Sequence, residues 1–260
     1  MAYRNLIIED RNSIRRITIH RPDKLNALNR ETIDELAVAF AQAQAEDTVR
    51  VVVLAGSGEK AFVAGADIGE LAALTPLQAQ ETARCGQAMM LGIERLGKPV
   101  IARIQGFALG GGLELAMCCH LRIGSDKAKV GQPEINLGVI PGFGGTQRLL
   151  RLAGRSAALE LCLTGATIDA ARAQALGVLT RVVPVDQLDA EIDKLADQLA
   201  ASAPHALRGI LEAILIGGEC GIEAGLDYES QAFGLVFSTE DMREGTKAFL
   251  ERRKPNFNGK

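Results

Sequence analysis

The sequence predicts an α/β fold with largely parallel strands and a helical C-terminal region. Short apolar runs alternate with stretches of helical periodicity over the first half of the chain, an order typical of parallel strands joined by crossover helices. The run at residues 49–55 is mostly β-branched, which predicts a strand buried on both faces. From residue 142 onward, nearly all of the periodicity is helical.

The first expected elements are a β-hairpin and a capped helix. Two apolar runs, 6–8 and 14–19, flank the polar tetrad 9–12 and predict a hairpin. Asn29 is a favourable N-cap for a helix that ends near Glu46, because the apolar residues that follow it recur at helical spacing.

The remaining elements follow from the same two periodicities. Thr75 and Pro76 supply the cap and first position of a helix, and Gly177 has the character of a C-cap. The expected strands are 49–55, 61–63, 100–104, 121–123 and 179–183, and the expected helices are 75–96, 155–163, 169–176, 186–202, 204–216, 222–237 and 241–250. We expect the basic tail at 252–260 to be loosely ordered.

Residues 99–134 carry the strongest local signal for chemistry. A buried-strand run is followed by Gly110-Gly111-Gly112 and then by the apolar start of a helix that contains Glu114. Glycines let the backbone approach a ligand, and the first N–H groups of a helix have no intrahelical acceptor, so an oxygen that gains negative charge can bind there. Glu134 follows a glycine-containing loop. One such site with two carboxylates nearby suits general acid–base chemistry on a carbonyl compound.

Each of these signals also has a purely structural interpretation. The glycines can serve tight helix–strand packing, Glu114 can form an ion pair with an arginine, and Glu134 can be a solvated turn residue. The 20 residues between the glutamates allow a helix outward and a strand back. We therefore expect both side chains at one cleft.

Composition excludes several classes of protein. The 260 residues suffice for one large domain, or for a core with a small appendage. With 47% hydrophobic and 23% charged residues and a net charge of −3, no electrostatic footprint for nucleic acid is visible. No apolar run approaches the length of a membrane span.

Cysteine usage indicates reduced thiols. The five cysteines, at positions 85, 118, 119, 162 and 220, form no C-x-x-C pair, and the three histidines are scattered. The usual spacing of a zinc site is therefore absent. The N-terminus lacks the pattern of a signal peptide, and we expect a cytoplasmic protein.

Five segments of the chain match the pattern of a known family in the family's order. They are RPDKLNAL at 21–28, AFVAGADI at 61–68, GFALGGGLELA at 106–116, GQPEI at 131–135 and IPGFGGTQRL at 140–149, and EGTKAFLERRKPNF follows at 244–257. The sequence resembles the enoyl-CoA hydratase/isomerase, or crotonase, family, and most closely its enoyl-CoA hydratases. The resemblance implies a spiral of ββα turns as the catalytic core at 1–199, and a helical trimerisation region at 200–260. It also implies a homotrimer or homohexamer that acts on an acyl-CoA thioester.

The resemblance implies a role for each residue of the site. The backbone N–H groups of Ala66 and Gly111 hold the thioester oxygen, although the segment around Ala66 can also be a simple turn. Glu114 orients and deprotonates the attacking water, and Glu134 holds or donates the proton that ends on C2. Water adds across the C2–C3 double bond of a trans-2-enoyl-CoA and gives a 3-hydroxyacyl-CoA. No metal or redox cofactor is needed, because the polarised thioester is the electron sink. The two glutamates should titrate as a coupled pair with at least one raised pKa.

The implied CoA contacts come from separate segments of the chain. Lys24, Leu25 and Ala27, together with Ala64, Asp67 and Ile68, line the adenine and phosphate region, Gly142 and Phe143 lie beside the acyl chain, and Lys247, Phe257 and Lys260 are further candidates. Lys24 can pair with a phosphate or be an ordinary loop lysine. His120 stands where many family members carry aspartate, and either interacts with a helix dipole or supports the site from behind.

Two other functions remain open. A double-bond isomerase of the same superfamily needs a carboxylate at the Glu134 position but usually not at Glu114. A non-catalytic acyl-CoA-binding or RNA-binding relative should lose a glutamate or carry a basic surface, and this chain shows neither. The presence of both glutamates favours hydration, and also disfavours the family's hydrolases, decarboxylases and dehalogenases.

Overall fold

A six-stranded sheet forms the centre of the fold in the computed structural model, which describes residues 3–260. Its first two strands form an antiparallel hairpin, and every later pairing in this sheet is parallel. In order across the sheet the strands are β1 (Leu6–Arg11), β2 (Ile14–Ile19), β3 (Val51–Gly56), β5 (Val100–Ile104), β7 (Leu121–Ser125) and β10 (Arg181–Val183). The prediction of an α/β fold with largely parallel pairing is confirmed.

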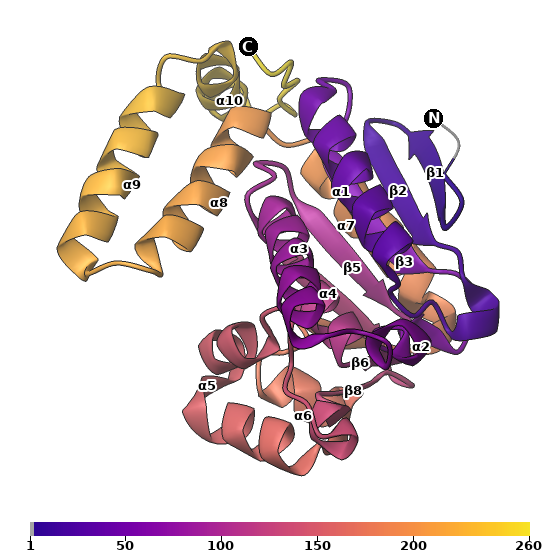
Figure 1. The fold of residues 1–260 in the computed structure, drawn as a ribbon. Helices are drawn as coiled ribbons and strands as arrows, with labels where there is room; N and C mark the ends of the chain where they lie inside the picture. Colours follow the sequence, from indigo (N-terminus) through magenta and orange to yellow (C-terminus); the bar gives the residue numbers. More distant parts are fainter. Residues whose placement is uncertain (1–2) are drawn as a thin grey trace.

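Helices cover both faces of this sheet (Figure 1). On one face lie α1 (Arg30–Ala45) and α3 (Pro76–Glu94), and on the other lies α7 (Leu188–Ala200). Side-chain alternation along β3 separates two cores, because Val52 and Leu54 are buried in the core under α1 and α3, whereas Val51 and Val53 are buried in the core under α7. Both faces of β3 are buried, as its apolar sequence predicts.

A second, smaller sheet positions the candidate site. Its four strands have three residues each and run in the order β4 (Ala61–Val63), β6 (Phe107–Leu109), β8 (Lys129–Gly131) and β9 (Thr167–Asp169). β4, β6 and β8 pair in parallel, and β9 pairs with β8 in the antiparallel sense. The sequence analysis predicts only β4 of these strands and also misses α2 (Ile68–Leu71), because such short elements do not display a period.

Side-chain caps explain where two of the predicted helices begin. Asn29 Oδ1 accepts a hydrogen bond from Thr32 N at 3.0 Å, and Thr75 forms a capping box with Gln78. Both predicted helix starts are confirmed. The other elements are α4 (Gly111–Met117), α5 (Gly145–Thr164), α6 (Ala170–Ala175) and the short 3₁₀ helices η1 (Pro22–Lys24), η2 (Pro133–Leu137) and η3 (Val185–Gln187).

Two predictions of local structure are wrong in detail. The hairpin turn is confined to Asn12 and Ser13, which both have positive φ, and β1 continues through Arg11. The helix expected at 155–163 is only the second half of α5, which bends at Gly154 where φ is 78°. The glycines around residue 144 conceal the first half of this helix, since glycine has a low helix propensity.

The last three helices project away from the core (Figure 1). They are α8 (Pro204–Gly217), α9 (Ile222–Val236) and α10 (Glu240–Leu250), and α8 and α9 lie side by side as a hairpin. The predicted boundary at 199/200 falls at the end of α7. No single helix within residues 3–260 has the length and apolar character of a membrane span, although Val185–Ala200 and Pro204–Gly217 meet that test as a pair bent by 106°.

The C-terminal tail has no helix or strand, but hydrogen bonds hold it against the rest of the chain. The Arg50 guanidinium donates to Phe257 O at 3.2 Å. The buried carboxylate of Asp241 accepts from Asn258 N at 2.8 Å and from Gly259 N at 2.9 Å. The expectation of a loosely ordered tail is therefore wrong, because tertiary partners far away in the sequence supply its order.

Candidate active site

Two backbone amides lie together where β4 ends and α4 begins. Ala66 follows β4, and Gly111 is the first residue of α4. A Cβ atom built on Gly111 would lie 3.5 Å from Ala66 N. Neither amide donates a hydrogen bond to another group within residues 3–260. Such a pair can hold one oxygen on which negative charge develops.

Glycine is required where α4 approaches its neighbours. A Cβ on Gly112 would lie 2.0 Å from Val63 O, so α4 is in backbone contact with β4. Gly110 has a φ of 52°, and a Cβ there would lie 2.9 Å from Glu134 Oε1. The glycine triplet therefore serves both tight packing and access to the site.

Glu114 is buried within α4, and main-chain amides hold one of its oxygens. Its exposed fraction is 1%. Oε1 accepts hydrogen bonds from Phe143 N at 2.8 Å and from Gly145 N at 2.6 Å. In the part of the chain that the structure describes, no group donates to Oε2, which leaves that oxygen for a water molecule. Arg148 pairs with Glu94 rather than with Glu114, so the alternative of an arginine ion pair is wrong.

Glu134 is half-buried at the start of η2 and faces the same region. The buried Gln132, with its amide nitrogen turned toward Glu134, donates to both carboxylate oxygens at 2.9 and 3.0 Å. A Cβ on Gly145 would lie 2.5 Å from the Gln132 amide and 2.9 Å from Glu114 Oε1, so both side chains approach Gly145. Gln132 thus holds Glu134 and lies close to the Gly145 amide that binds Glu114. Glu134 is not a solvated turn residue.

The electrostatic environment raises the pKa of both carboxyl groups. Burial raises the pKa of Glu114 to about 7, and the charge of Glu134 acts in the same direction. The amides of Gly145 and Phe143 and the positive charge of Arg148 oppose this rise. Burial also raises the pKa of Glu134. A carboxyl group that titrates near neutral pH can take up and release a proton under working conditions.

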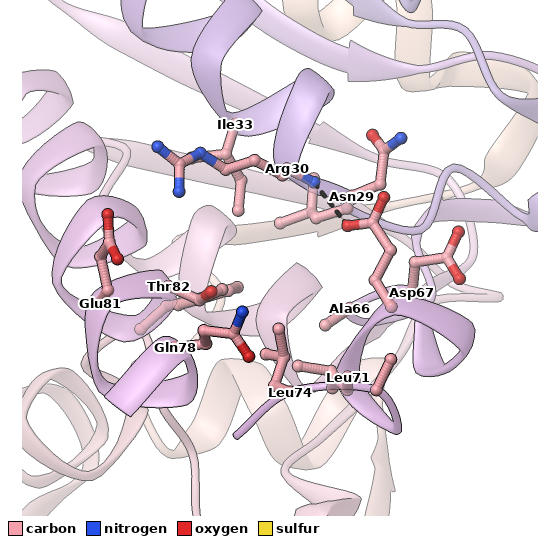
Figure 2. A pocket seen from close by; sticks show the side chains of 14 residues that line it. Asn29, Arg30, Ile33, Ala66, Asp67, Leu71, Leu74, Gln78, Glu81 and Thr82 are labelled. Atoms are coloured by element: carbon pink, nitrogen blue, oxygen red, sulfur yellow. Dashed lines mark hydrogen bonds between the residues drawn. The ribbon is translucent and has the colours of Figure 1, made fainter. Parts of the chain in front are cut away.

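A cavity of about 410 Å³ opens beside Ala66 and Phe143 (Figure 2). Its walls come from α1, α2 and α3. Its apolar lining includes Leu28, Ile33, Leu71 and Leu74, and its polar lining includes Arg30, Glu70, Gln78, Glu81 and Thr82. The cavity therefore has an apolar interior next to the amide pair and polar groups around it, as expected for a small-molecule site.

The residues predicted to contact the adenine and phosphates form one lip of the site. Hydrogen bonds join the two segments, from Ala64 N to Leu25 O at 3.1 Å and from Asp67 N to Leu28 O at 2.7 Å. Lys24 and Ile68 are exposed on this lip, and Ala27 is half-buried within it. The Asp67 carboxylate pairs with Arg21 at 3.0 Å and caps α2 at Gly69 N. Its side chain therefore already has two structural partners.

Phe143 lies beside the amide pair and lines the cavity, and Gly142 precedes it in the chain. Gln87 Nε2 donates to Gly142 O at 2.9 Å. The Phe143 ring fills the space between α3 and α4, because a Cβ on Gly86 would lie 2.3 Å from it and a Cβ on Gly111 would lie 3.4 Å from it. The structure thus places the ring beside the predicted oxygen-binding site.

The predicted C-terminal contacts do not reach the cavity within this chain. Phe257 packs near Gly245 and bonds Arg50, and Lys260 O accepts from Glu240 N. Lys247 lies on α10 beside Glu251, and α10 and the C-terminus lie at the end of the molecule opposite α2 (Figure 1). These three residues are not part of the site that this chain forms.

His120 links the start of β5 to the C-terminal end of α3. Its Nδ1 accepts from Val100 N at 2.9 Å, so Nε2 carries the proton and donates to Glu94 O at 3.0 Å. Burial lowers the pKa of His120. His120 therefore interacts with a helix C-terminus, but the helix is α3 and not α4, which precedes His120 in the chain. Through Glu94 it is also connected to Arg148.

Two polar residues of the site are absent from the sequence-based prediction. Gln132 holds Glu134, and Arg148 donates to Phe143 O at 2.7 Å. Both fall inside the segments GQPEI and IPGFGGTQRL. No spacing rule marks either of them, because their partners come from other elements.

Comparison with curated proteins extends over nearly the whole chain. The chain is 43% identical over 257 residues to the crotonyl-CoA hydratase of Syntrophomonas wolfei, covering 99% of both chains. It is 42% identical over 254 residues to the short-chain-enoyl-CoA hydratase of Clostridium acetobutylicum, covering 98% of this chain and 97% of that protein.

Solved structures agree with this relationship. An enoyl-CoA hydratase subunit of Geobacillus kaustophilus superposes with a TM-score of 0.94 at 42% identity, over 99% of both chains. The enoyl-CoA hydratase of Bacillus anthracis superposes with a TM-score of 0.96 at 39% identity, over 99% of this chain and 100% of that one. The model of the enoyl-CoA hydratase/isomerase family matches residues 9–260. On these matches and on the paired glutamates beside an amide pair, this chain belongs to the enoyl-CoA hydratase/isomerase family.

Proposed function

We propose that this protein is an enoyl-CoA hydratase, a hydro-lyase that converts a trans-2-enoyl-CoA to a 3-hydroxyacyl-CoA. One observation carries the assignment: Glu114 and Glu134 lie close enough for the charge of Glu134 to act on Glu114, near the amides of Ala66 and Gly111. Addition of water needs a group that removes a proton from water and a group that delivers one to carbon. The alternative, a double-bond isomerase, usually has a carboxylate only at the position of Glu134. It therefore explains a site with two glutamates less well than hydration does.

In the proposed mechanism the thioester oxygen binds the N–H groups of Ala66 and Gly111. These amides stabilise the charge that moves onto the oxygen when water attacks C3. Glu114, with Oε1 fixed by two amides, accepts a proton from the water through Oε2. Glu134 holds the water from its other side and delivers a proton to C2. The thioester accepts the electron pair, so the proposed reaction uses no metal or redox cofactor.

A short acyl chain is the substrate that the cavity and the relatives favour. The 410 Å³ cavity beside the amide pair is bounded by Gln78, Glu81 and Thr82 of α3. A long apolar chain would have to desolvate these polar groups. The curated relatives are named for crotonyl-CoA and for short-chain enoyl-CoA.

The apolar helices outside the core support an assembly of several copies. Large apolar side chains remain exposed along α8 and α9, among them Ile214, Leu226, Phe233 and Leu235. Faces of this kind are usually covered by protein. We retain the homotrimer, or a hexamer of two trimers, as the proposed assembly. A cytoplasmic location also remains a proposal, supported by the free thiols of all five cysteines.

Loss of crotonyl-CoA absorbance in the enone band, without added cofactor, tests the activity. Glu114→Gln and Glu134→Gln should each lower kcat by about 10²–10⁴-fold, because each removes one proton-transfer group, and should change substrate binding little. Since Gln retains the size and hydrogen-bonding oxygen of Glu, circular dichroism should show an intact fold in both variants. Full activity in either variant would contradict the assigned roles.

A further inference from the structure

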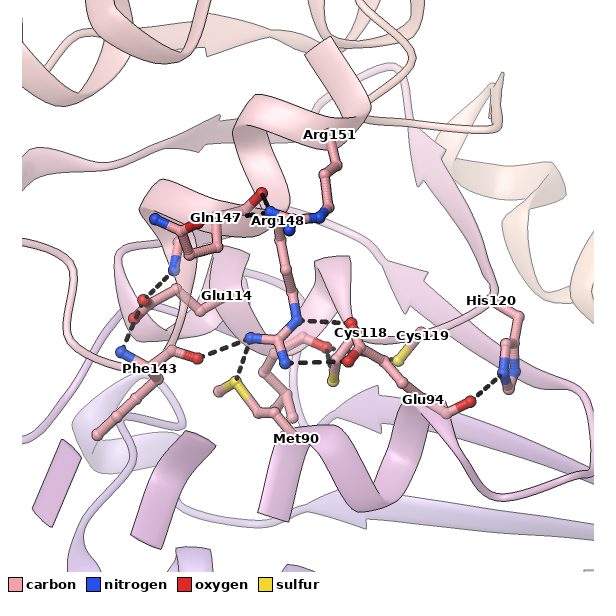
Figure 3. A network of polar contacts seen from close by, with 12 residues as sticks. Met90, Glu94, Glu114, Cys118, Cys119, His120, Phe143, Gln147, Arg148 and Arg151 are labelled. Atoms are coloured by element: carbon pink, nitrogen blue, oxygen red, sulfur yellow. Dashed lines mark hydrogen bonds and ion pairs between the residues drawn. The ribbon is translucent and has the colours of Figure 1, made fainter. Parts of the chain in front are cut away.

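We propose that Arg148 is a positioning residue for the reaction: it fixes the Phe143 peptide that holds Glu114. This inference rests on the proposed hydratase function. Arg148 does not itself line the cavity, and its contact with the lining is the hydrogen bond to the main-chain oxygen of Phe143. It acts only through Phe143, Glu94 and Glu114, which Figure 3 shows together with it.

One peptide unit connects Arg148 to the proposed base. Arg148 Nη1 donates to Phe143 O at 2.7 Å, and Phe143 N donates to Glu114 Oε1 at 2.8 Å. The orientation of this peptide plane therefore depends on the guanidinium at one end and decides the position of the carboxylate at the other. A shift of Arg148 moves the oxygen that must accept a proton from water.

The guanidinium is itself held rigidly. Its Nε and Nη2 donate to the two oxygens of Glu94 at 2.6 and 3.2 Å, and both side chains are largely buried, with 13% and 22% exposed. The planar fork of arginine makes two parallel bonds to one carboxylate and still has a donor left for a carbonyl. Lysine cannot make all three bonds with this geometry. Glu94 in turn accepts from His120 through its main-chain oxygen.

Titratable side chains from several elements lie around Glu114 and Arg148, and the two cysteines among them are neutral thiols because burial raises their pKa. Glu134 approaches from η2, and Arg148 and Cys162 approach from α5. Glu94 of α3 and Cys118 of α4 lie behind, beside the guanidinium. Arg148 is the cation in this set, and it opposes the burial and the Glu134 charge that raise the pKa of Glu114. Without it, less of the Glu114 carboxyl group is ionised at neutral pH.

Three variants separate position from charge, and a fourth is a matched control. Arg148→Gln removes both effects, Arg148→Lys keeps the charge without the three-bond geometry, and Glu94→Gln loosens Arg148 while removing a negative charge. Arg151→Gln is the control, because Arg151 lies one turn further along α5 in an exposed pair with Glu219. The readouts are kcat and KM for crotonyl-CoA against pH.

The expected results differ in kind among the variants. Arg148→Gln should lower kcat by about 10- to 100-fold with little change in KM. It should also move the acid limb, the low-pH side of the plot of kcat against pH, to higher pH, because loss of the positive charge raises the pKa of Glu114. Arg148→Lys should lower kcat while leaving the acid limb close to that of the wild type. Glu94→Gln should lower kcat by less and move the acid limb to lower pH. Arg151→Gln should change neither quantity.

The proposal is overturned if Arg148→Gln leaves kcat and the acid limb unchanged, or if Arg148→Lys moves the limb as far as Arg148→Gln does. If Arg148→Gln does not fold, the other two variants decide the matter: an acid limb that moves in Arg148→Lys, or that stays in place in Glu94→Gln, overturns the proposal. Titration of the carboxyl carbon of Glu114 by NMR, assigned with Glu114→Gln, gives the same test without turnover. Absence of hydratase activity in the wild type would then refute the proposed function, whereas an unmoved titration in Arg148→Gln would refute the role of Arg148.

Discussion

At the scale of single residues, Glu114 has the most unusual environment in the site. A buried carboxyl group normally costs stability when it is ionised. Two amides and the charge of Arg148 reduce that cost at Glu114, yet its pKa still rises from 4.5 to about 7. The folded protein therefore binds one proton more than the unfolded chain does between these two values, and this group makes stability fall as pH rises through that window.

This linkage predicts that Glu114→Gln stabilises the protein at alkaline pH. Below about pH 4.5, where the carboxyl is protonated in both states, the variant and the wild type should have similar free energies of unfolding. Above pH 7 the variant should be more stable by up to about 3 kcal/mol, because it has no buried charge to desolvate. Urea denaturation at pH 4.5 and pH 8 measures the difference. A difference that is independent of pH would contradict the raised pKa.

At the scale of elements, the site depends on the contact between α4 and β4. This contact brings Gly111 of the helix next to Ala66 after the strand. It has no room for a side chain at Gly112, where a Cβ would lie 2.0 Å from Val63 O. The register between one helix and one strand thus determines the geometry of the amide pair.

Gly112→Ala should therefore damage both the fold and the activity. Overpacking against a backbone carbonyl should cost about 1–3 kcal/mol, and the displaced helix should lower kcat by at least about tenfold, because an amide donor moves. Gly92→Ala is the matched control, since a Cβ at Gly92 on α3 meets no atom within 4 Å. That variant should gain about 0.5–1 kcal/mol from helix propensity and keep full activity. Thermal unfolding and crotonyl-CoA turnover measure both effects.

At the scale of the whole molecule, the chain combines a closed core with an arm of exposed apolar helices. The sheet is covered on both faces, but α8 and α9 leave large apolar side chains in solvent. Water contact with such a face is unfavourable by about 25 cal/mol per Å². Association of copies through these helices removes that cost.

Charges placed on this arm should dissociate the assembly. Ile214→Glu combined with Phe233→Glu should reduce the mass seen by sedimentation equilibrium from that of a trimer or larger to that of a monomer, because buried charges would have no partners. Leu77→Glu, at a position that is 80% exposed on α3, is the control and should leave the mass unchanged. A wild type that sediments as a monomer would refute the proposed assembly directly.

Most of the fold and half of the site were predictable because their signals are local. The cap at Asn29, the capping box at Thr75 and the apolar run of β3 depend on neighbouring residues only, and each prediction is confirmed. The three-residue strands of the second sheet could not be predicted, because they form only where other strands pair with them. The docked tail depends likewise on distant partners.

By itself, the sequence determined the fold class, the family resemblance and the two glutamates, since these depend on residue types at short spacings. Only the tertiary structure decided that the Ala66 and Gly111 amides lie together, that Gln132 holds Glu134, and that Arg148 holds the Phe143 peptide. It also decided that His120 binds Val100 and the last carbonyl of α3 rather than the end of α4. The physical reason is that hydrogen bonds and burial join residues far apart along the chain, and local patterns carry no record of such partners.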